Sequence, residues 1–123
     1  MSKRLIALAA LGLALIGSPA LSAENRCGWL HNPTPGNLWL DDSESTWILM
    51  SQGMPDEALG MENIPDFSER DYVRTNGNYG YACACIEVDT ESRDGIDRVV
   101  AVYSFKQLKL SKCENDRNLP KPE

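Results

Sequence analysis

Two closely spaced cysteines, Cys83 and Cys85, are the residues whose types and spacing most suggest chemistry. A Cys-x-Cys pair could bind a metal or exchange a disulfide, and the single histidine, His31, could supply one more ligand. Structural zinc sites, however, usually combine Cys-x2-Cys spacing with a second pair of ligands. We therefore expect no metal and no cofactor, and we interpret the cysteines as structural.

Disulfides are the expected state of all four cysteines, Cys27, Cys83, Cys85 and Cys113. An even number of cysteines in a small exported domain typically forms a disulfide framework. Cys83 and Cys85 lie two apart on one expected strand, so they point to the same face and cannot easily bridge each other. Two pairings remain open: Cys27 with Cys83 and Cys113 with Cys85, or Cys27 with Cys85 and Cys83 with Cys113. Each bridge closes a long loop and should stabilise the fold by roughly 3 to 4 kcal/mol.

Clustered carboxylates at Asp41, Asp42 and Glu44 could form a cation site or act on a glycosidic bond. Neighbours in one flexible turn are poorly placed to flank a scissile bond, so we expect them to be solvated. His31 has no partner nucleophile in the sequence pattern, and we expect it to be a hydrogen-bonded loop residue. With the cysteines bridged and no nucleophile motif present, the chain is not expected to be an enzyme and has no predicted catalytic residue.

The first 23 residues have the pattern of a signal peptide. Lys3 and Arg4 precede an apolar run from Leu5 to Ile16, which is shorter than the roughly 20 residues that a membrane-spanning helix needs. We expect cleavage after Ala23, with Ala20 as the alternative, and no membrane anchor afterwards. The mature protein is therefore predicted to be in the periplasm or secreted.

The mature part is small and acidic. Removal of the leader leaves 100 residues with ten basic and eighteen acidic side chains, a net charge of −8. This size suits a single domain, which we assign to residues 24–117, followed by a flexible tail at 118–123. An acidic surface argues against nucleic acid as a partner, and it suits a basic protein or simple solubility.

Hairpins are expected to build the domain. The runs 38–40 and 46–50 flank a segment rich in turn-forming residues and should pair. Asn76-Gly77 predicts a two-residue turn with positive φ at both positions, and this register places Tyr72 opposite Tyr81.

A second two-residue turn is predicted at Asp94-Gly95. It pairs Glu91 with Arg98, and further along it brings Ala101 alongside Val88. Opposite charges and apolar faces then coincide, which supports this register.

The strand after the first turn divides its side chains by parity. The even positions from Gly80 to Val88 begin with three very small residues, so a bulky group must pack close over them. The odd positions from Tyr79 to Asp89 are partly covered by disulfides, so the strand is central rather than an edge. We predict an all-β domain, a small disulfide-linked antiparallel sheet forming a partly open barrel or sandwich, with a minor helix possible around Asp56 to Leu59.

The aromatic residues offer the best candidates for binding. Trp29, Trp39 and Trp47 either fill the core of a small domain or form an exposed platform for a sugar or a peptide. If these rings are exposed together with the tyrosines beside a groove, they make a binding site, whereas buried rings are only core. The candidate binding residues are Asn78, Tyr79, Tyr81 and Trp39.

The sequence also resembles a family of small exported bacterial proteins catalogued as a domain of unknown function. The resemblance rests on Cys27-Gly28-Trp29, on the segments 32–37 and 75–81, on Cys83-Ala84-Cys85 and on the segment 110–113. It covers nearly the whole mature chain and supports export and disulfide bonding. It implies no activity and no functional residues.

These observations favour a non-enzymatic recognition module that binds a cell-envelope glycan or a protein. One alternative is an inhibitor of a basic lytic enzyme such as lysozyme, since small, acidic, disulfide-linked β-domains suit that role. Another alternative is a structural or stress-related envelope protein without a small ligand, which buried tryptophans and a surface without pockets would favour.

Overall fold

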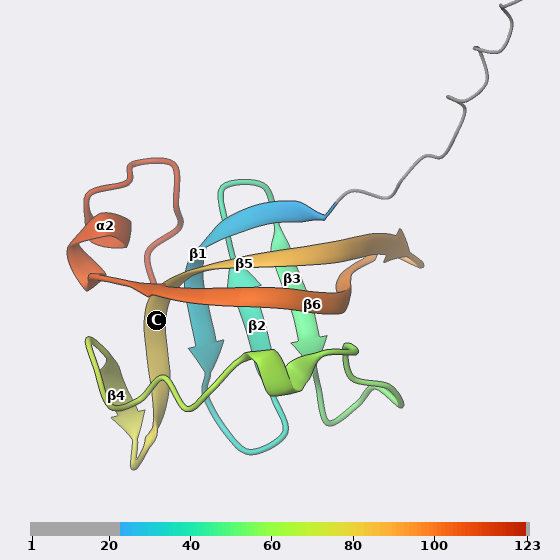
Figure 1. The fold of residues 1–123 in the computed structure, drawn as a ribbon, viewed down its shortest axis with the longest axis horizontal. Helices are drawn as coiled ribbons and strands as arrows, with labels where there is room; N and C mark the ends of the chain where they lie inside the picture. The colour runs from blue at the N-terminus through green and yellow to red at the C-terminus, as the bar shows by residue number, and fades with distance from the viewer. Residues whose placement is uncertain (1–22, 123) are drawn as a thin grey trace, which may run out of the picture.

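The computed structural model describes residues 23–122, so the predicted signal peptide up to residue 22 lies outside the described residues. Within that range the chain forms strands with two short helical segments (Figure 1). They are β1 (Glu24–Asn32), β2 (Leu38–Asp41), β3 (Thr46–Met50), the 3-10 helix η2 (Met61–Asn63), β4 (Val73–Asn76), β5 (Tyr79–Arg93), β6 (Ile96–Leu108) and α2 (Leu110–Glu114).

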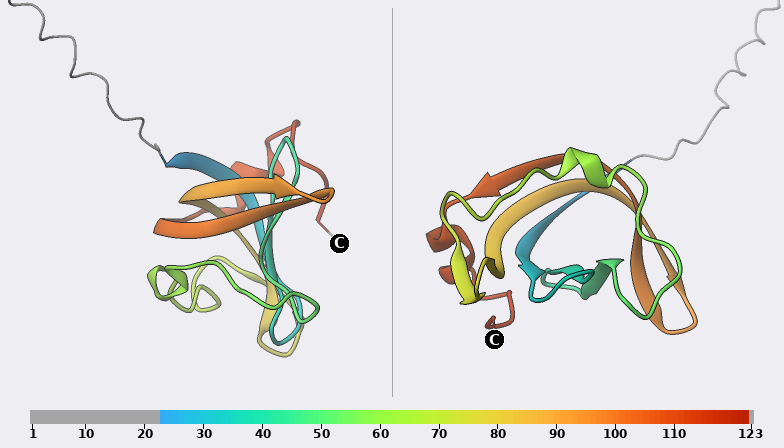
Figure 2. Two further views of the ribbon diagram at one scale, coloured as in Figure 1. Left: turned by 90° about the vertical axis from the view of Figure 1, so that its right-hand side faces the viewer. Right: turned by 90° about the horizontal axis from the view of Figure 1, so that it is seen from below.

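Five of these strands form a ring. The order is β1-β2-β3-β6-β5, β1 pairs with β5 to complete it, and β4 lies on the other side of β5. Figure 2 shows how strongly the sheet curves. Neighbouring strands are antiparallel except β3 and β6, which pair in parallel at Ile48 and Arg98. The prediction of an all-β, disulfide-linked domain is confirmed, and of the two expected forms, a partly open barrel or a sandwich, the ring corresponds to the first. The sheet is mixed rather than purely antiparallel, because β3 and β6 are parallel.

A short extended segment fills the junction between β3 and β6. The N–H of Ala58 donates to the carbonyl of Leu49 in β3 at 2.9 Å, and the N–H of Leu59 donates to the carbonyl of Val100 in β6 at 3.0 Å. The helix predicted around Asp56 to Leu59 is therefore wrong. Its backbone groups bond to the flanking strands, and this pairing satisfies them in an extended conformation.

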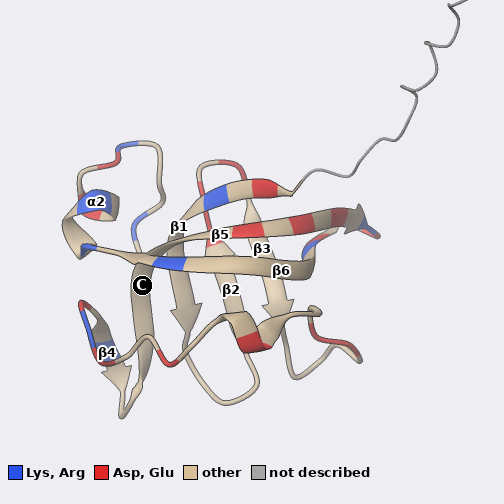
Figure 3. Ribbon diagram, in the orientation of Figure 1, with Lys and Arg blue, Asp and Glu red and all other residues tan. Residues whose placement is uncertain are grey.

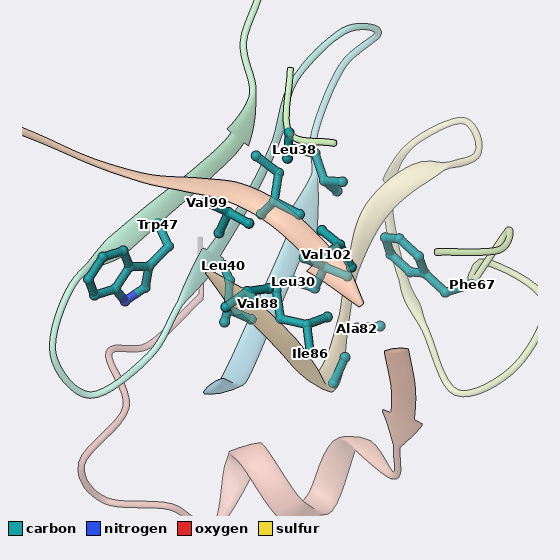
Figure 4. Packing of buried hydrophobic residues seen from close by; sticks show 13 residues of the cluster. Leu30, Leu38, Leu40, Trp47, Phe67, Ala82, Ile86, Val88, Val99 and Val102 are labelled. Carbon is teal, nitrogen blue, oxygen red and sulfur yellow. The ribbon is translucent and has the colours of Figure 1, made fainter. Parts of the chain in front are cut away.

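β5 is central, as predicted, because it pairs with β1 and β6 and, near its start, with β4. Its even-numbered residues from Gly80 to Val88 are all buried and face the core drawn in Figure 4. A Cβ at Gly80 would lie 1.8 Å from the carbonyl oxygen of Val73, so β4 packs directly against this position. The core residues are Leu30, Leu38, Leu40, Trp47, Leu49, Ala58, Phe67, Ala82, Ala84, Ile86, Val88, Val99 and Val102.

The predicted turn at Asp94-Gly95 is confirmed, since both residues have positive φ, 55° and 78°. Next to the turn Glu91 lies opposite Arg98, also as predicted. An irregularity between Asp89 and Thr90 shifts the register, so Val88 lies opposite Val102, one position beyond its predicted partner, and a second one follows between Val88 and Glu87. Such bulges increase the local twist, which helps a sheet to curve into a ring.

The hairpin between β4 and β5 turns one residue later than predicted. The turn is Gly77-Asn78, with φ of 62° at the glycine, and Asn76 lies opposite Tyr79. The predicted pairing of Tyr72 with Tyr81 is therefore wrong. Glycine supplies the positive φ equally well at the second position of an Asn-Gly turn and at the first position of a Gly-Asn turn, so the dipeptide alone does not fix the register.

The two disulfides are Cys27–Cys85 and Cys83–Cys113. The structure thereby selects one of the two pairings that the sequence left open. Cys27 and Cys85 lie opposite each other on β1 and β5, whereas Cys83 fastens β5 to α2. Cys83 and Cys113 are buried with Trp29 in a second, smaller apolar cluster.

Candidate functional site

Three aromatic rings lie side by side on β2, β1 and β5. His31 of β1 lies opposite Trp39 of β2 and opposite Tyr81 of β5. The ring centroids are 6.0 Å apart for His31 and Trp39, and 5.3 Å apart for His31 and Tyr81. Their sequence neighbours Leu30 and Leu40 face the core, so the three rings lie on the outer face of the sheet. We call Trp39, His31 and Tyr81 the aromatic row.

The row combines one buried ring with two half-buried rings. His31 is 7% exposed, whereas Trp39 and Tyr81 keep a larger part of their surface in solvent. Tyr81 also packs edge-on against buried Trp29, with 5.3 Å between the ring centroids. Trp29 and Trp47 are core residues, and Trp39 is the tryptophan that is left available to a ligand.

His31 is a strand residue, and the prediction that it lies in a loop is wrong. Its Nε2 atom is 3.3 Å from Oδ2 of Asp41, which the pairing of β1 with β2 brings alongside. The row is therefore held in place by strand register, and a carboxylate lies beside its central ring.

The four predicted binding residues fall into two groups. Trp39 and Tyr81 belong to the aromatic row. Asn78 and Tyr79 instead line a cavity of about 380 Å³ beside the β4–β5 hairpin.

Sequence reasoning missed His31 as a member of the row. The available signal was parity, because Cys27, Trp29 and His31 alternate along β1 and so share a face. The expectation that His31 lies in a loop obscured this signal, since the strand extends to Asn32 before the loop begins.

A groove borders the row at Tyr81. It has a volume of about 530 Å³ and lies between Tyr81 and Trp29 on one side and the C-terminal segment with Arg117 and Leu119 on the other. Leu119, at the start of the predicted tail, packs against the cluster around Trp29. A ligand on the aromatic row could extend from Tyr81 into this groove.

Asp42 is buried, and the prediction of a solvated carboxylate is wrong for this residue. It accepts hydrogen bonds from Arg26 at 2.8 Å, from the indole N–H of Trp47 at 3.0 Å, and from the backbone N–H groups of Glu44 and Ser45. Burial alone would raise the pKa of Asp42, but the hydrogen bonds from Arg26 and these N–H groups outweigh it and hold the pKa below the ordinary 3.8. Asp42 therefore anchors the turn between β2 and β3.

Acidic residues recur along β5, and one acidic residue, followed by a basic one, lies at the start of β1 (Figure 3). Glu87 on β5 is exposed and accepts a hydrogen bond from Ser104, and Asp89 accepts one from the hydroxyl of Tyr103. Tyr103 is itself 52% exposed. Glu87 and Asp89 therefore place negative charge on β5, between β1 and β6.

Within residues 23–122, no three His, Cys, Asp or Glu side chains are grouped closely enough to hold a metal ion. Among the helices of the same range, none is long and apolar enough to cross a membrane.

The family of the chain follows from a comparison with family models. Residues 21–120 match the model described as a protein of unknown function, DUF4087. Searches of curated proteins and of solved structures give no match. The matched range includes the ring, both disulfides and the aromatic row. The chain therefore belongs to the DUF4087 family, which confirms the predicted membership in a family of unknown function.

Proposed function

We propose that the protein is an extracytoplasmic recognition module that binds a glycan of the cell envelope on the aromatic row. The observation that carries the proposal is the alignment of Trp39, His31 and Tyr81 across three neighbouring strands. Aromatic rings that are already ordered and partly solvated offer the apolar face of a sugar a large contact area at a small cost in conformational entropy.

The cysteines and the leader support a location outside the cytoplasm. All four cysteines are in disulfides, which persist in oxidising compartments. The basic and apolar leader predicts export. A cell-envelope glycan is accessible to a protein in that location.

A binding role suits these residues better than a catalytic one. The four cysteines, which could have acted as nucleophiles, are bonded to one another. The buried carboxylate of Asp42 accepts four hydrogen bonds, which leaves it poorly suited to proton transfer.

Co-sedimentation of the purified mature chain with insoluble peptidoglycan tests the proposal, and titration with soluble peptidoglycan fragments, followed by tryptophan fluorescence, gives the affinity. We expect Trp39→Ala and Tyr81→Ala each to weaken binding about tenfold, the loss of roughly 1.4 kcal/mol. Tyr103→Ala is the matched control, because Tyr103 is an exposed aromatic side chain on β6 and does not belong to the row.

Failure of the wild-type chain to bind both the sacculi and the fragments would overturn the proposal. So would equal binding by the wild type and by both row variants, once circular dichroism shows that the variants are folded.

A second candidate function is inhibition of a basic lytic enzyme, and the acidic residues along β5 favour it. Negative charge there would steer a basic protein towards the domain and would fit a cationic active-site cleft. Stoichiometric addition of the chain to lysozyme acting on a cell-wall suspension tests this candidate. Inhibition that Glu87→Gln weakens, and that salt suppresses, supports it, whereas unchanged clearing together with no complex at low salt rules it out.

A further inference from the structure

The cavity beside the β4–β5 hairpin has the volume and the lining of a small-molecule site that is distinct from the aromatic row. Its volume of about 380 Å³ falls within the range of roughly 300 to 1,000 Å³ that is typical of ligand pockets. It lies between the hairpin, the start of β2 and the segment that follows η2. From the chemistry of its walls, we infer that it binds a small uncharged amphiphile, with an apolar body and an amide or hydroxyl head.

The floor of the cavity is apolar. Two core residues, Leu38 and Phe67, line the cavity. Three partly buried residues that pack against the same core also line it: Met50, Met61 and Ile64. Methionine side chains adjust their shape readily, so they can close around a flexible or irregular apolar group. The floor thus suits a short aliphatic chain or a ring.

The walls of the cavity are held at several points. Phe67 is tied to β6, because Gln107 donates from Nε2 to its carbonyl at 3.0 Å. Asn63, which directly precedes the lining segment that begins at Ile64, donates from Nδ2 to the carbonyl of Val102 at 2.9 Å. The hydroxyl of Tyr72 donates to the carbonyl of Asn78 at 2.8 Å and so links the hairpin to the wall. The cavity is therefore preformed.

The rim of the cavity is polar and has one charged lining residue, Asp66, with an arginine nearby. Asn32 and Asn78 contribute amides, each of which can donate and accept a hydrogen bond. Asp66 adds one carboxylate, and hydrogen bonds from the side chain and backbone of Ser68 hold its pKa below the ordinary value. The guanidinium of Arg74 lies 5.5 Å from the ring centroid of Tyr72, another lining residue, and its positive charge also acts on Asp66.

These charges decide the class of ligand. An anionic head would be repelled by Asp66, and the attraction of a cationic head to Asp66 is offset by Arg74, whose positive charge already acts on that carboxylate, so neither gains a net attraction that repays its lost hydration. A neutral head can exchange hydrogen bonds with the two asparagine amides without this loss. The floor excludes strongly polar molecules, because they would leave their groups unpaired against Leu38 and Phe67.

Three probes with the same eight-carbon chain and different heads test the inference: octanamide, octanoate and octylamine. Each is titrated into the folded chain, and the dissociation constant is followed by amide NMR shifts. We expect octanamide to bind about tenfold more tightly than either ionic probe and to shift the amides of Met61, Ile64 and Asn78. Met61→Trp should fill the cavity and abolish binding, whereas Met54→Trp, at a methionine that lines a separate hollow, should leave it unchanged.

Asn78→Ala provides a second variant, because Asn78 is exposed at the hairpin turn and its truncation spares the core. It should weaken octanamide binding at least threefold. Tighter binding by an ionic probe, absence of binding by all three probes, or binding that both Met61→Trp and Asn78→Ala leave intact would each overturn the inference. Trp39→Ala should not affect octanamide binding, so this result is independent of glycan binding on the aromatic row.

Discussion

The guanidinium of Arg26 lies over the indole ring of Trp47, with Cζ 3.9 Å from the ring centroid, and both side chains donate hydrogen bonds to Asp42. The contact joins the start of β1 to β3, and the hydrogen bonds to Asp42 tie both strands to the turn between β2 and β3. Burial alone would lower the pKa of Arg26, but hydrogen bonds to Asp42, Glu44 and Glu24 outweigh it and raise the pKa above the usual value. The arginine therefore remains charged while it stacks on the ring.

Removal of the shared carboxylate should be costly. Asp42→Ala leaves the buried indole N–H of Trp47 without its acceptor and takes from Arg26 its most buried partner, so we expect a loss of about 3 kcal/mol in the free energy of unfolding. Urea unfolding measures it. Glu44→Ala is the control, because Glu44 contacts the same arginine but its side chain is 69% exposed, and it should cost less than about 1 kcal/mol. Equal losses in the two variants would contradict this account.

Stability should fall in acid because of the same carboxylate. The native pKa of Asp42 lies below its ordinary value of 3.8, so the native state binds its proton less readily than the unfolded chain does. The stability from its ionised form is fully present above pH 3.8 and is lost as the pH falls through the lower native pKa. The urea concentration at the unfolding midpoint should therefore decrease as the pH is lowered below about 4. Asp42→Asn should be less stable than the wild type at pH 7, and its urea midpoint should decrease less in acid. If the midpoints of the two proteins change with pH in parallel, the acid sensitivity does not come from Asp42.

Much of the fold could be predicted from local sequence patterns. Alternation along β5 identified a central strand, and Asp94-Gly95 identified a turn with positive φ at both residues. The Gly77-Asn78 turn escaped prediction because the choice between two adjacent registers is made by contacts outside the hairpin. One such contact is the packing of Tyr72 against Phe67, with ring centroids 5.7 Å apart.

The candidate site was harder to predict than the fold. The aromatic row exists because His31 lies opposite Tyr81, and that pairing joins strands far apart in the sequence. No local pattern specifies a non-local register. The disulfide pairing also depends on a non-local register. The parity of β5 excluded a bridge between Cys83 and Cys85, but only the pairing of β1 with β5 places Cys27 opposite Cys85.

The two disulfides should differ in their resistance to reduction. Cys27 is exposed, whereas Cys83 is 0% and Cys113 is 4% exposed. A thiolate must reach a sulfur to break the bond, so a mild reductant should open Cys27–Cys85 first. Alkylation followed by peptide mass spectrometry identifies the order. Earlier labelling of Cys83 and Cys113 would contradict it.

Gly28 should be intolerant of any side chain. A Cβ at Gly28 would lie 2.1 Å from the carbonyl oxygen of Asp41, so Gly28→Ala must push β1 away from the end of β2. We expect a loss of about 3 kcal/mol in the free energy of unfolding. Gly53→Ala is the control, because a Cβ at Gly53 meets no atom within 4 Å, and it should change stability by less than about 0.5 kcal/mol. Thermal unfolding of both variants compares them, and similar melting temperatures would show that β1 can yield at Gly28.

The pairing of β1 with β5 has a consequence for the order in which the domain assembles. Of the strands in residues 23–122, β1 is synthesised first. β2 pairs with it only from Trp29 onward, so residues 24–28 stay unpaired until β5 has been made. Their partners, residues 84–88, are made after most of the chain. Such non-local pairing makes folding slow. Formation of the Cys27–Cys85 bond therefore fixes the pairing of β1 with β5, and the ring closes once β6 has also paired with β3.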